Sequence, residues 1–159
     1  MPSVTGASTG FGRDMTEWAL KQGDIVVASA RKPESLNDLK TSYAADQLLT
    51  IRLDVDKATE IKQAFVQAKN AFGRVDVVFN NAGWSVVGEI EAVPEDEARK
   101  LFDTNFWGAS NVSREAVRFF REENRPSGGF LIVTSSVVGV QATAGGGYYS
   151  ASKHGKCFS

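Results

Sequence analysis

Hydrophobic and polar positions follow two alternating patterns along the chain. Short apolar runs at 25–30, 75–79 and 130–133 have the length of strands that are covered on both faces. Between such runs, apolar residues recur every three or four positions, which is typical of one face of a helix. The clearest example comprises Ile61, Ala64, Phe65, Ala68 and Phe72, and Gly73 follows it as a helix stop.

The two patterns together predict a doubly wound parallel sheet. We predict strands at 3–5, 25–30, 48–53, 75–79 and 130–134. Helices are predicted after the first glycines to about Gln22, at 33–43, over 61–72, at 94–124 and from Tyr149 onward. Strands that alternate with helices indicate right-handed crossovers and a three-layer α/β/α architecture. A length of 159 residues suits one domain, so we expect residues 1–159 to form a single unit.

Composition and charge exclude several classes of function. Eighteen basic and nineteen acidic residues give a net charge of −1, which argues against nucleic acid as a partner. One histidine and one cysteine cannot build a thiolate and imidazole zinc site, and we expect no metal. No apolar run approaches the ~20 residues of a membrane span. The first ten residues lack the features of a signal peptide, so we expect a cytoplasmic protein.

Three glycines, Gly6, Gly10 and Gly12, follow the first strand in the spacing G-x-x-x-G-x-G. Between a strand and a helix, such glycines allow backbone N–H groups to approach a pyrophosphate. An ordinary tight turn is one alternative. A second is the G-x-S-x-G elbow of α/β-hydrolases, with Ser8 as nucleophile. That elbow normally follows several strands, and its histidine would have to be His154, the only one in the chain.

The end of the second predicted strand carries a charge signal for the cofactor. Domains of this kind that prefer NAD place an acidic residue there, about 20 residues after the glycines, to hold the ribose 2′-hydroxyl. This chain has Arg31 and Lys32 and no carboxylate at that point. A guanidinium pairs well with a 2′-phosphate, so we predict NADP(H) in preference to NAD(H). The alternative is a solvated basic turn.

Six motifs, taken in order, are similar to those of the short-chain dehydrogenase/reductase family. They are the glycine motif of residues 5–12, Asp54-Val55, the NNAG of residues 80–83, Asn105, the serine pair 135–136, and the Y-x-x-x-K of Tyr149 and Lys153. Their order and spacing match the family over nearly the whole chain. Spacing to Tyr149 favours Ser136 over Ser135, and Tyr149 is favoured over Tyr148 because Lys153 follows it by four residues.

The resemblance implies an oxidoreductase that transfers hydride between NADP(H) and an alcohol or carbonyl substrate. Tyr149 would exchange a proton with the substrate oxygen, and the Lys153 ammonium would stabilise its phenolate from the same helix face. Ser136 would hydrogen-bond the substrate oxygen, and Asn105 would hold a water in the proton relay. The implied cofactor-binding residues are Gly6, Ser8, Thr9, Gly10, Phe11, Gly12, Arg31, Asp54, Val55, Asn81, Ala82, Gly83, Tyr149 and Lys153.

The resemblance also sets expectations about partners and about where this chain differs from the family. The substrate would be a small alcohol, ketone or aldehyde, and the helical region 94–124 would be available for a homo-oligomer contact. Trp84 and Trp107 are expected to pack in the core or against a helix. Family members normally continue well beyond Lys153. We therefore expect a five-stranded sheet with one uncovered edge and a Tyr149 helix of barely two turns. A truncated fragment that binds nucleotide without turnover is the alternative function.

Overall fold

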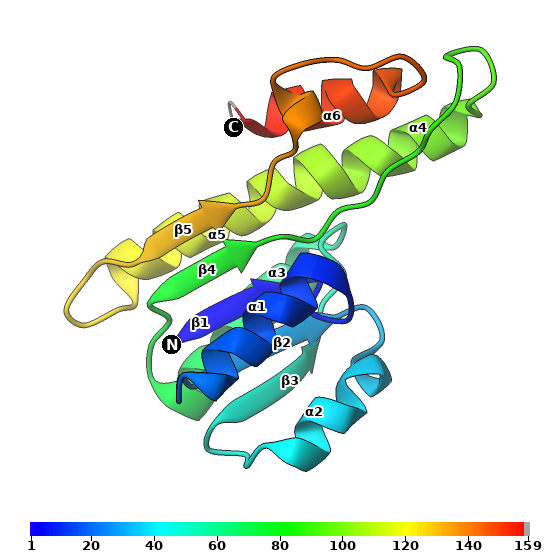
Figure 1. Cartoon of the computed structure of the whole chain (residues 1–159). Coiled ribbons are helices and arrows are strands. Elements are labelled where there is room, and N and C mark those ends of the chain that lie inside the picture. The colour runs from blue at the N-terminus through cyan, green and yellow to red at the C-terminus, as the bar shows by residue number, and fades with distance from the viewer. Residues whose placement is uncertain (158–159) are drawn as a thin grey trace.

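The computed structural model describes residues 1–157, so the last two residues of the predicted domain lie outside the described part. Its centre is one parallel sheet in the order β3-β2-β1-β4-β5 (Figure 1). The strands are β1 (Pro2–Thr5), β2 (Val26–Ala30), β3 (Leu48–Arg52), β4 (Val77–Asn80) and β5 (Phe130–Val133). All four neighbouring pairs are parallel, which confirms the predicted doubly wound sheet.

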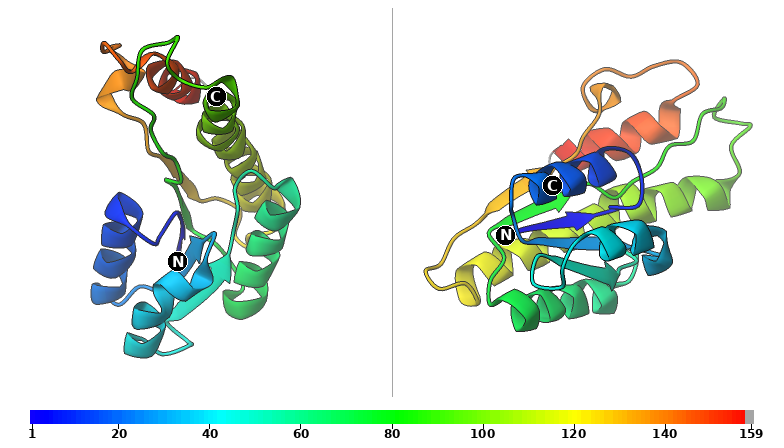
Figure 2. Two further views of the ribbon diagram at one scale, coloured as in Figure 1. Left: turned by 90° about the vertical axis from the view of Figure 1, so that its right-hand side faces the viewer. Right: turned by 60° about the horizontal axis from the view of Figure 1, so that its bottom comes forward.

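Helices connect the strands and cover the sheet on both faces. They are α1 (Gly10–Lys21), α2 (Asn37–Ser42), α3 (Ala58–Phe72), α4 (Glu95–Phe102), α5 (Ala109–Glu122) and α6 (Gly147–Cys157). Shorter segments are the 3₁₀ turns η1 (Pro33–Leu36) and η3 (Val137–Gly139) and the π-helical turn η2 (Asp103–Gly108). Helices α1 and α2 lie on one face and α3 and α5 on the other (Figure 2).

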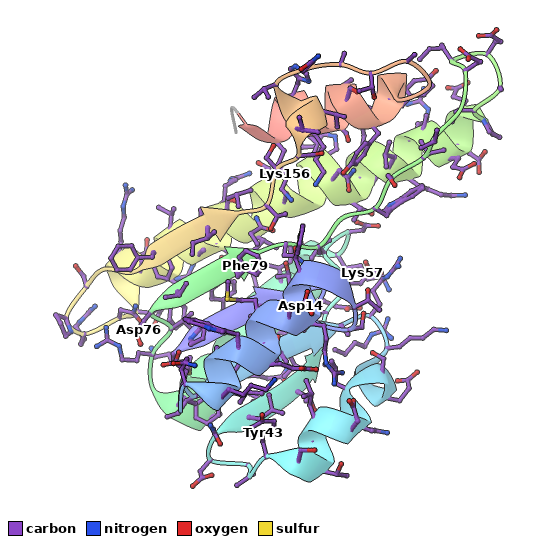
Figure 3. The ribbon with its side chains drawn as sticks, viewed as in Figure 1. Asp14, Tyr43, Lys57, Asp76, Phe79 and Lys156 are labelled. Carbon is purple, nitrogen blue, oxygen red and sulfur yellow. The ribbon has the colours of Figure 1, made fainter. Side chains whose placement is uncertain are left out.

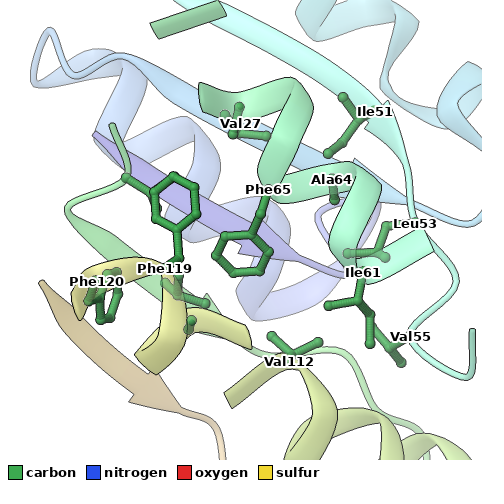
Figure 4. Packing of buried hydrophobic residues seen from close by; sticks show 14 residues of the cluster. Val27, Ile51, Leu53, Val55, Ile61, Ala64, Phe65, Val112, Phe119 and Phe120 are labelled. Carbon is green, nitrogen blue, oxygen red and sulfur yellow. The ribbon is translucent and has the colours of Figure 1, made fainter. Parts of the chain in front are cut away.

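Two apolar clusters hold these layers together. In one, Phe65 of α3 and Phe119 of α5 meet with ring centroids 5.4 Å apart over the sheet (Figure 4). The other lies under α1 and α2. Strand β2 supplies both clusters, Val27 to the first and Val26 to the second, because successive side chains point to opposite faces. This explains why its sequence is continuously apolar.

Most charged side chains lie on the outside of the layers, such as Asp14 on α1 and Lys57 before α3 (Figure 3). Strand β5 forms one edge of the sheet, and there the apolar side chains of Phe130 and Ile132 are 74% and 46% exposed. Within residues 1–157, no helix combines the length and the apolar character needed to cross a membrane.

Three predicted helices differ from the structure in detail. The segment 33–43 is a 3₁₀ turn followed by α2, and 94–124 is interrupted by the π-helical turn η2. At that turn Gly108 packs on Val55, since a Cβ built on Gly108 would lie 2.9 Å from Val55 Cγ2. Helix α6 begins at Gly147 and has 11 residues, so the expectation of barely two turns is wrong. Its early start is fixed by the Ser150 N–H, which donates to the Gly146 carbonyl at 2.7 Å.

Candidate functional site

A cavity of about 600 Å³ lies at the carboxyl ends of the five strands. This is the edge where ligands bind in open α/β sheets, at the point where strand order reverses, here between β1 and β4. Its lining comprises Gly6, Ser8, Thr9, Gly10, Phe11, Ala30, Arg31, Leu53, Asp54, Val55, Asn81, Ala82, Gly83, Trp84, Ser85, Thr104, Thr134, Ser135, Ser136, Val137, Tyr149 and Lys153. Of the residues predicted for the site, only Gly12 and Asn105 do not line it.

The glycine turn forms the floor of the cavity next to the start of α1. Gly6 and Gly10 have positive φ angles of 67° and 54°, which glycine adopts without a steric cost. Gly12 has a packing role instead, because a Cβ there would lie 2.2 Å from the Gly6 carbonyl oxygen. The first turn of α1 carries no acidic residue, and Gly10 and Phe11 line the cavity. A helix N-terminus in this setting suits a phosphate group.

A hydrogen-bonded brace ties the turn after β1 to the loop after β4. The Thr5 hydroxyl accepts from the backbone N–H groups of Asn81 and Ala82 at 2.9 and 3.0 Å. The Asn81 amide donates to the Thr5 carbonyl at 3.2 Å and accepts from the Thr134 hydroxyl at 3.2 Å. Sequence analysis gave no role to Thr5 or Thr134, although both stand at or just after strand ends, where such side chains face the site.

The opposite end of the cavity is formed by the segments that follow β2 and β3. Exposed Arg31 lies there with Asp54 and Val55. The Arg31 carbonyl accepts from Arg52 at 3.3 Å, which joins the two segments. The backbone N–H of Asp54 donates to a Glu60 carboxylate oxygen at 2.8 Å, and this contact lowers the pKa of Glu60. No carboxylate occurs between residues 25 and 33, so a phosphate at Arg31 would meet no acidic group from that strand end.

The reactive side chains predicted from the sequence come together beside the loop after β5. Tyr149 and Lys153 are one turn apart on α6, with Lys153 Nζ 5.7 Å from the Tyr149 ring centroid. Lys153 is 4% exposed and donates to the Thr134 carbonyl at 3.4 Å. The Ser136 hydroxyl accepts from the Val138 N–H at 3.4 Å, which orients it at the start of η3. A buried ammonium next to a phenol can stabilise the phenolate.

Asn105 is buried behind the cavity and joins three segments. Its amide oxygen accepts from the Trp84 N–H at 3.0 Å, and its amide nitrogen donates to the Trp84 carbonyl at 2.8 Å. The same nitrogen donates to the Ser152 hydroxyl at 3.1 Å, and Ser152 in turn donates to the Tyr149 carbonyl at 2.8 Å. Asn105 thus links the loop after β4 to the helix of Tyr149. Ser152, at the third variable position of the Y-x-x-x-K motif, was missed by the sequence analysis.

Neither tryptophan is in the core, although both were expected to pack there or against a helix. Trp84 lines the cavity, and Trp107 is 58% exposed with its ring edge-on to Phe106. Among residues 1–157, no three His, Cys, Asp or Glu side chains gather closely enough to hold a metal ion.

Comparison with known proteins identifies the class to which this fold and site belong. Residues 3–157 match the family model described as short chain dehydrogenase, and the chain belongs to this family. This assignment argues against the α/β-hydrolase alternative for Gly6–Gly10.

Individual relatives agree with the family assignment. "Oxidoreductase calM" from Penicillium decumbens is 38% identical over 154 residues, covering 94% of this chain and 50% of the relative. A short-chain dehydrogenase from Streptomyces avermitilis superposes with a TM-score of 0.89 at 37% identity, covering 97% of this chain and 55% of that one. An alcohol dehydrogenase from Thermococcus sibiricus, solved with 5-hydroxy-NADP, gives 0.88 at 25% identity over 98% and 66%. The chain spans about half the length of the curated relatives it matches.

Proposed function

We propose that this chain binds NADP(H) and carries the reactive residues of an oxidoreductase that interconverts an alcohol and a ketone or aldehyde. The observation behind this proposal is that one cavity contains both a phosphate-compatible glycine turn and the group Ser136, Tyr149 and Lys153. The family assignment and its oxidoreductase relatives support it.

The residues of the cavity fit a dinucleotide. Gly6 leaves no room for a side chain, since a Cβ there would lie 3.1 Å from Ala82 Cα. The cavity walls are therefore backbone at this point, as a pyrophosphate site requires. We assign the phosphates to the turn of Gly6–Gly12 and the start of α1, the adenosine end to Asp54 and Val55, and the nicotinamide end to the segment Asn81–Gly83 with Tyr149 and Lys153.

When bound, the nicotinamide would supply the hydride that the carbonyl carbon gains in reduction and would accept it from the alcohol carbon in oxidation. In reduction, Tyr149 donates its hydroxyl proton to the carbonyl oxygen of the substrate, which becomes the hydroxyl of the alcohol. Lys153 stabilises the phenolate that remains, and Ser136 donates a hydrogen bond that stabilises charge on the reacting oxygen. Oxidation reverses each transfer. Asn105 keeps the Trp84 loop and α6 in register through its three hydrogen bonds.

Cofactor preference is assigned to Arg31. A charge-assisted hydrogen bond contributes about 1.5–3 kcal/mol, so Arg31→Ala should weaken NADPH binding by roughly tenfold to a hundredfold and leave NADH binding little changed. The matched control is Lys32→Ala, which removes the neighbouring charge from a residue outside the cavity lining. Both variants are titrated with each cofactor by thermal unfolding. Equal loss of NADPH affinity in the two variants would contradict a specific role for Arg31.

Turnover separates an enzyme from a fragment that binds nucleotide only. NADPH oxidation is followed with a panel of ketones and aldehydes, using the parent chain, Tyr149→Phe and Tyr148→Phe. We expect Tyr149→Phe to abolish turnover while NADPH still binds, and the adjacent Tyr148→Phe to retain it. If NADPH stabilises the parent but no carbonyl compound is reduced, the alternative of a nucleotide-binding fragment replaces the proposed activity.

Two further features of the proposal are a homo-oligomer contact through the helical region 94–124 and a cytoplasmic location. Both stay predictions. The oligomeric state is measured by sedimentation, with Trp107→Lys as the variant, because this exposed side chain lies in that region. A monomeric parent chain would contradict the contact.

A further inference from the structure

The cavity is bordered at its Tyr149 end by apolar side chains that do not belong to the core. Trp84 and Val137 line the cavity there. Val137 is 70% exposed, and Val140, three residues later, is 78% exposed. Val137 begins the 3₁₀ turn η3, and Val140 is the residue that follows it. Val138 between them is buried, which shows that η3 presents an inner and an outer apolar side.

The loop that begins at Trp84 lines the cavity with Trp84 and Ser85 and then continues beyond it. Its side chains Val87 and Ile90 are 80% and 53% exposed. The loop is fixed in place, since the Gly88 N–H donates to the Gly145 carbonyl at 2.8 Å. A Cβ built on Gly147 would lie 2.4 Å from Ile90 Cδ1, so the glycines before Tyr149 allow this close approach.

Charge is distributed unevenly between the two ends of the site. Arg31 and Lys32 mark the end assigned to the adenosine phosphate. At the other end, the Lys153 ammonium lines the cavity beside Tyr149, and residues 134–152 contain no further charged side chain. Within residues 84–94 the only charged residues are Glu89 and Glu91. Apart from Lys153 beside Tyr149, these segments therefore offer no cation to an anionic group, and neither glutamate lines the cavity.

We propose, resting on the proposed function, that the carbonyl substrate is an uncharged molecule with an extended apolar group. Trp84 and Val137 contact this group, and their apolar side chains offer no partner to a carboxylate or phosphate. Apolar contact favours removal of the group from water, whereas an unpaired anion loses its hydration without compensation. Selectivity then depends on whether that group carries a charge.

The test compares 2-decanone with 9-oxodecanoate, which place the ketone at the same position of a ten-carbon chain and differ in the terminal carboxylate. The whole 159-residue chain is first saturated with NADP⁺. Binding of each compound is then followed by NMR through the indole N–H signals of the protein's three tryptophans. Trp84→Phe assigns the signal of Trp84. The readout requires no turnover.

We expect 2-decanone to shift the Trp84 signal and to bind at least about tenfold more tightly than 9-oxodecanoate, a difference of about 1.4 kcal/mol. Val137→Lys should reverse this preference. Val66→Lys, which changes an exposed valine on α3 outside the cavity lining, should keep it. If NADP⁺ binds and the two ketones bind equally or not at all, the inference is wrong. If NADP⁺ itself does not bind, the proposed function fails instead.

Discussion

Gly12 is the residue at which this structure makes its sharpest quantitative prediction. In α1 it lies against the glycine turn, and a Cβ built on it would lie 2.2 Å from the Gly6 carbonyl oxygen and 2.7 Å from Asn81 Nδ2. The oxygen belongs to the backbone, so relief requires α1 and the turn to move apart. Gly12→Ala is therefore expected to displace the glycine turn that we assign to the phosphates, although residue 12 itself does not line the cavity.

The magnitude follows from two opposing effects. Replacing glycine by alanine within a helix favours folding by about 1 kcal/mol. Overpacking typically costs about 1–3 kcal/mol, and contact with backbone at this distance belongs at or beyond the upper end of that range. We expect a net loss of about 2 kcal/mol, which lowers the Tm of a chain of this size by about 4–8 °C. Displacement of the turn should weaken NADPH binding by at least about tenfold.

The assay is urea unfolding of the parent and variant, followed by NADPH titration of the folded chains. Gly73→Ala is the matched control. Gly73 has a φ of 81° after α3, and a Cβ there would have no atom within 4 Å. This control should lose about 1–2 kcal/mol through backbone strain alone and keep the parent's NADPH affinity.

Two results for Gly12→Ala would refute the reasoning. Stability equal to the parent's would show that the turn accommodates a methyl group, against the distance to the Gly6 oxygen. A destabilised variant with unchanged NADPH affinity would show that the position of α1 does not control the phosphate site.

Three further predictions concern the core, a pH-dependent contact and the buried amide. Phe119→Ala should cost about 3–5 kcal/mol in urea unfolding, whereas Val66→Ala on the exposed face of α3 should stay within about 0.5 kcal/mol. The hydrogen bond from the Asp54 N–H lowers the pKa of Glu60 in the folded chain. The stability from this contact is therefore present above the unfolded pKa of about 4.3 and is lost as pH falls through the lower folded value. Glu60→Gln should flatten the pH dependence of unfolding below about pH 5, and an unchanged slope would contradict this. Asn105→Ala should lower the free energy of unfolding by about 1–3 kcal/mol for each buried group left without its partner. It should also lower kcat more than it raises KM. Thermal unfolding like that of the parent would contradict the linking role of Asn105.

Much of the fold follows from the sequence because each element's own residues determine it. The apolar run of β2 requires cover on both faces, and the stripe of α3 requires one buried side. The carboxyl ends of parallel strands meet at one edge of the sheet, so motifs that follow strands converge there. That is why the glycine turn and Arg31 could be placed at one site from their positions after strands, and why Asn81 and Ser136, assigned through the family resemblance, lie at the same edge.

Contacts between segments were decided only by the tertiary structure. Asn105 is 21 residues from Trp84 and 47 residues from Ser152 along the chain, and its three hydrogen bonds depend on how η2 and α6 pack. Periodicity indicates which face of a helix is buried but not which polar group it meets across the interface. For the same reason the brace at Thr5 was missed.

The sequence by itself determined the doubly wound sheet, the glycine turn, the Tyr149 and Lys153 pair and the charge at Arg31, since each rests on the order of residues within an element or at its end. The tertiary structure decided that Gly12 acts through packing, that Asn105 lies behind the cavity rather than in it, and that exposed Val137 lines the cavity with Tyr149. These features arise where separate segments approach within a few ångströms, and that approach depends on the packing of the whole fold.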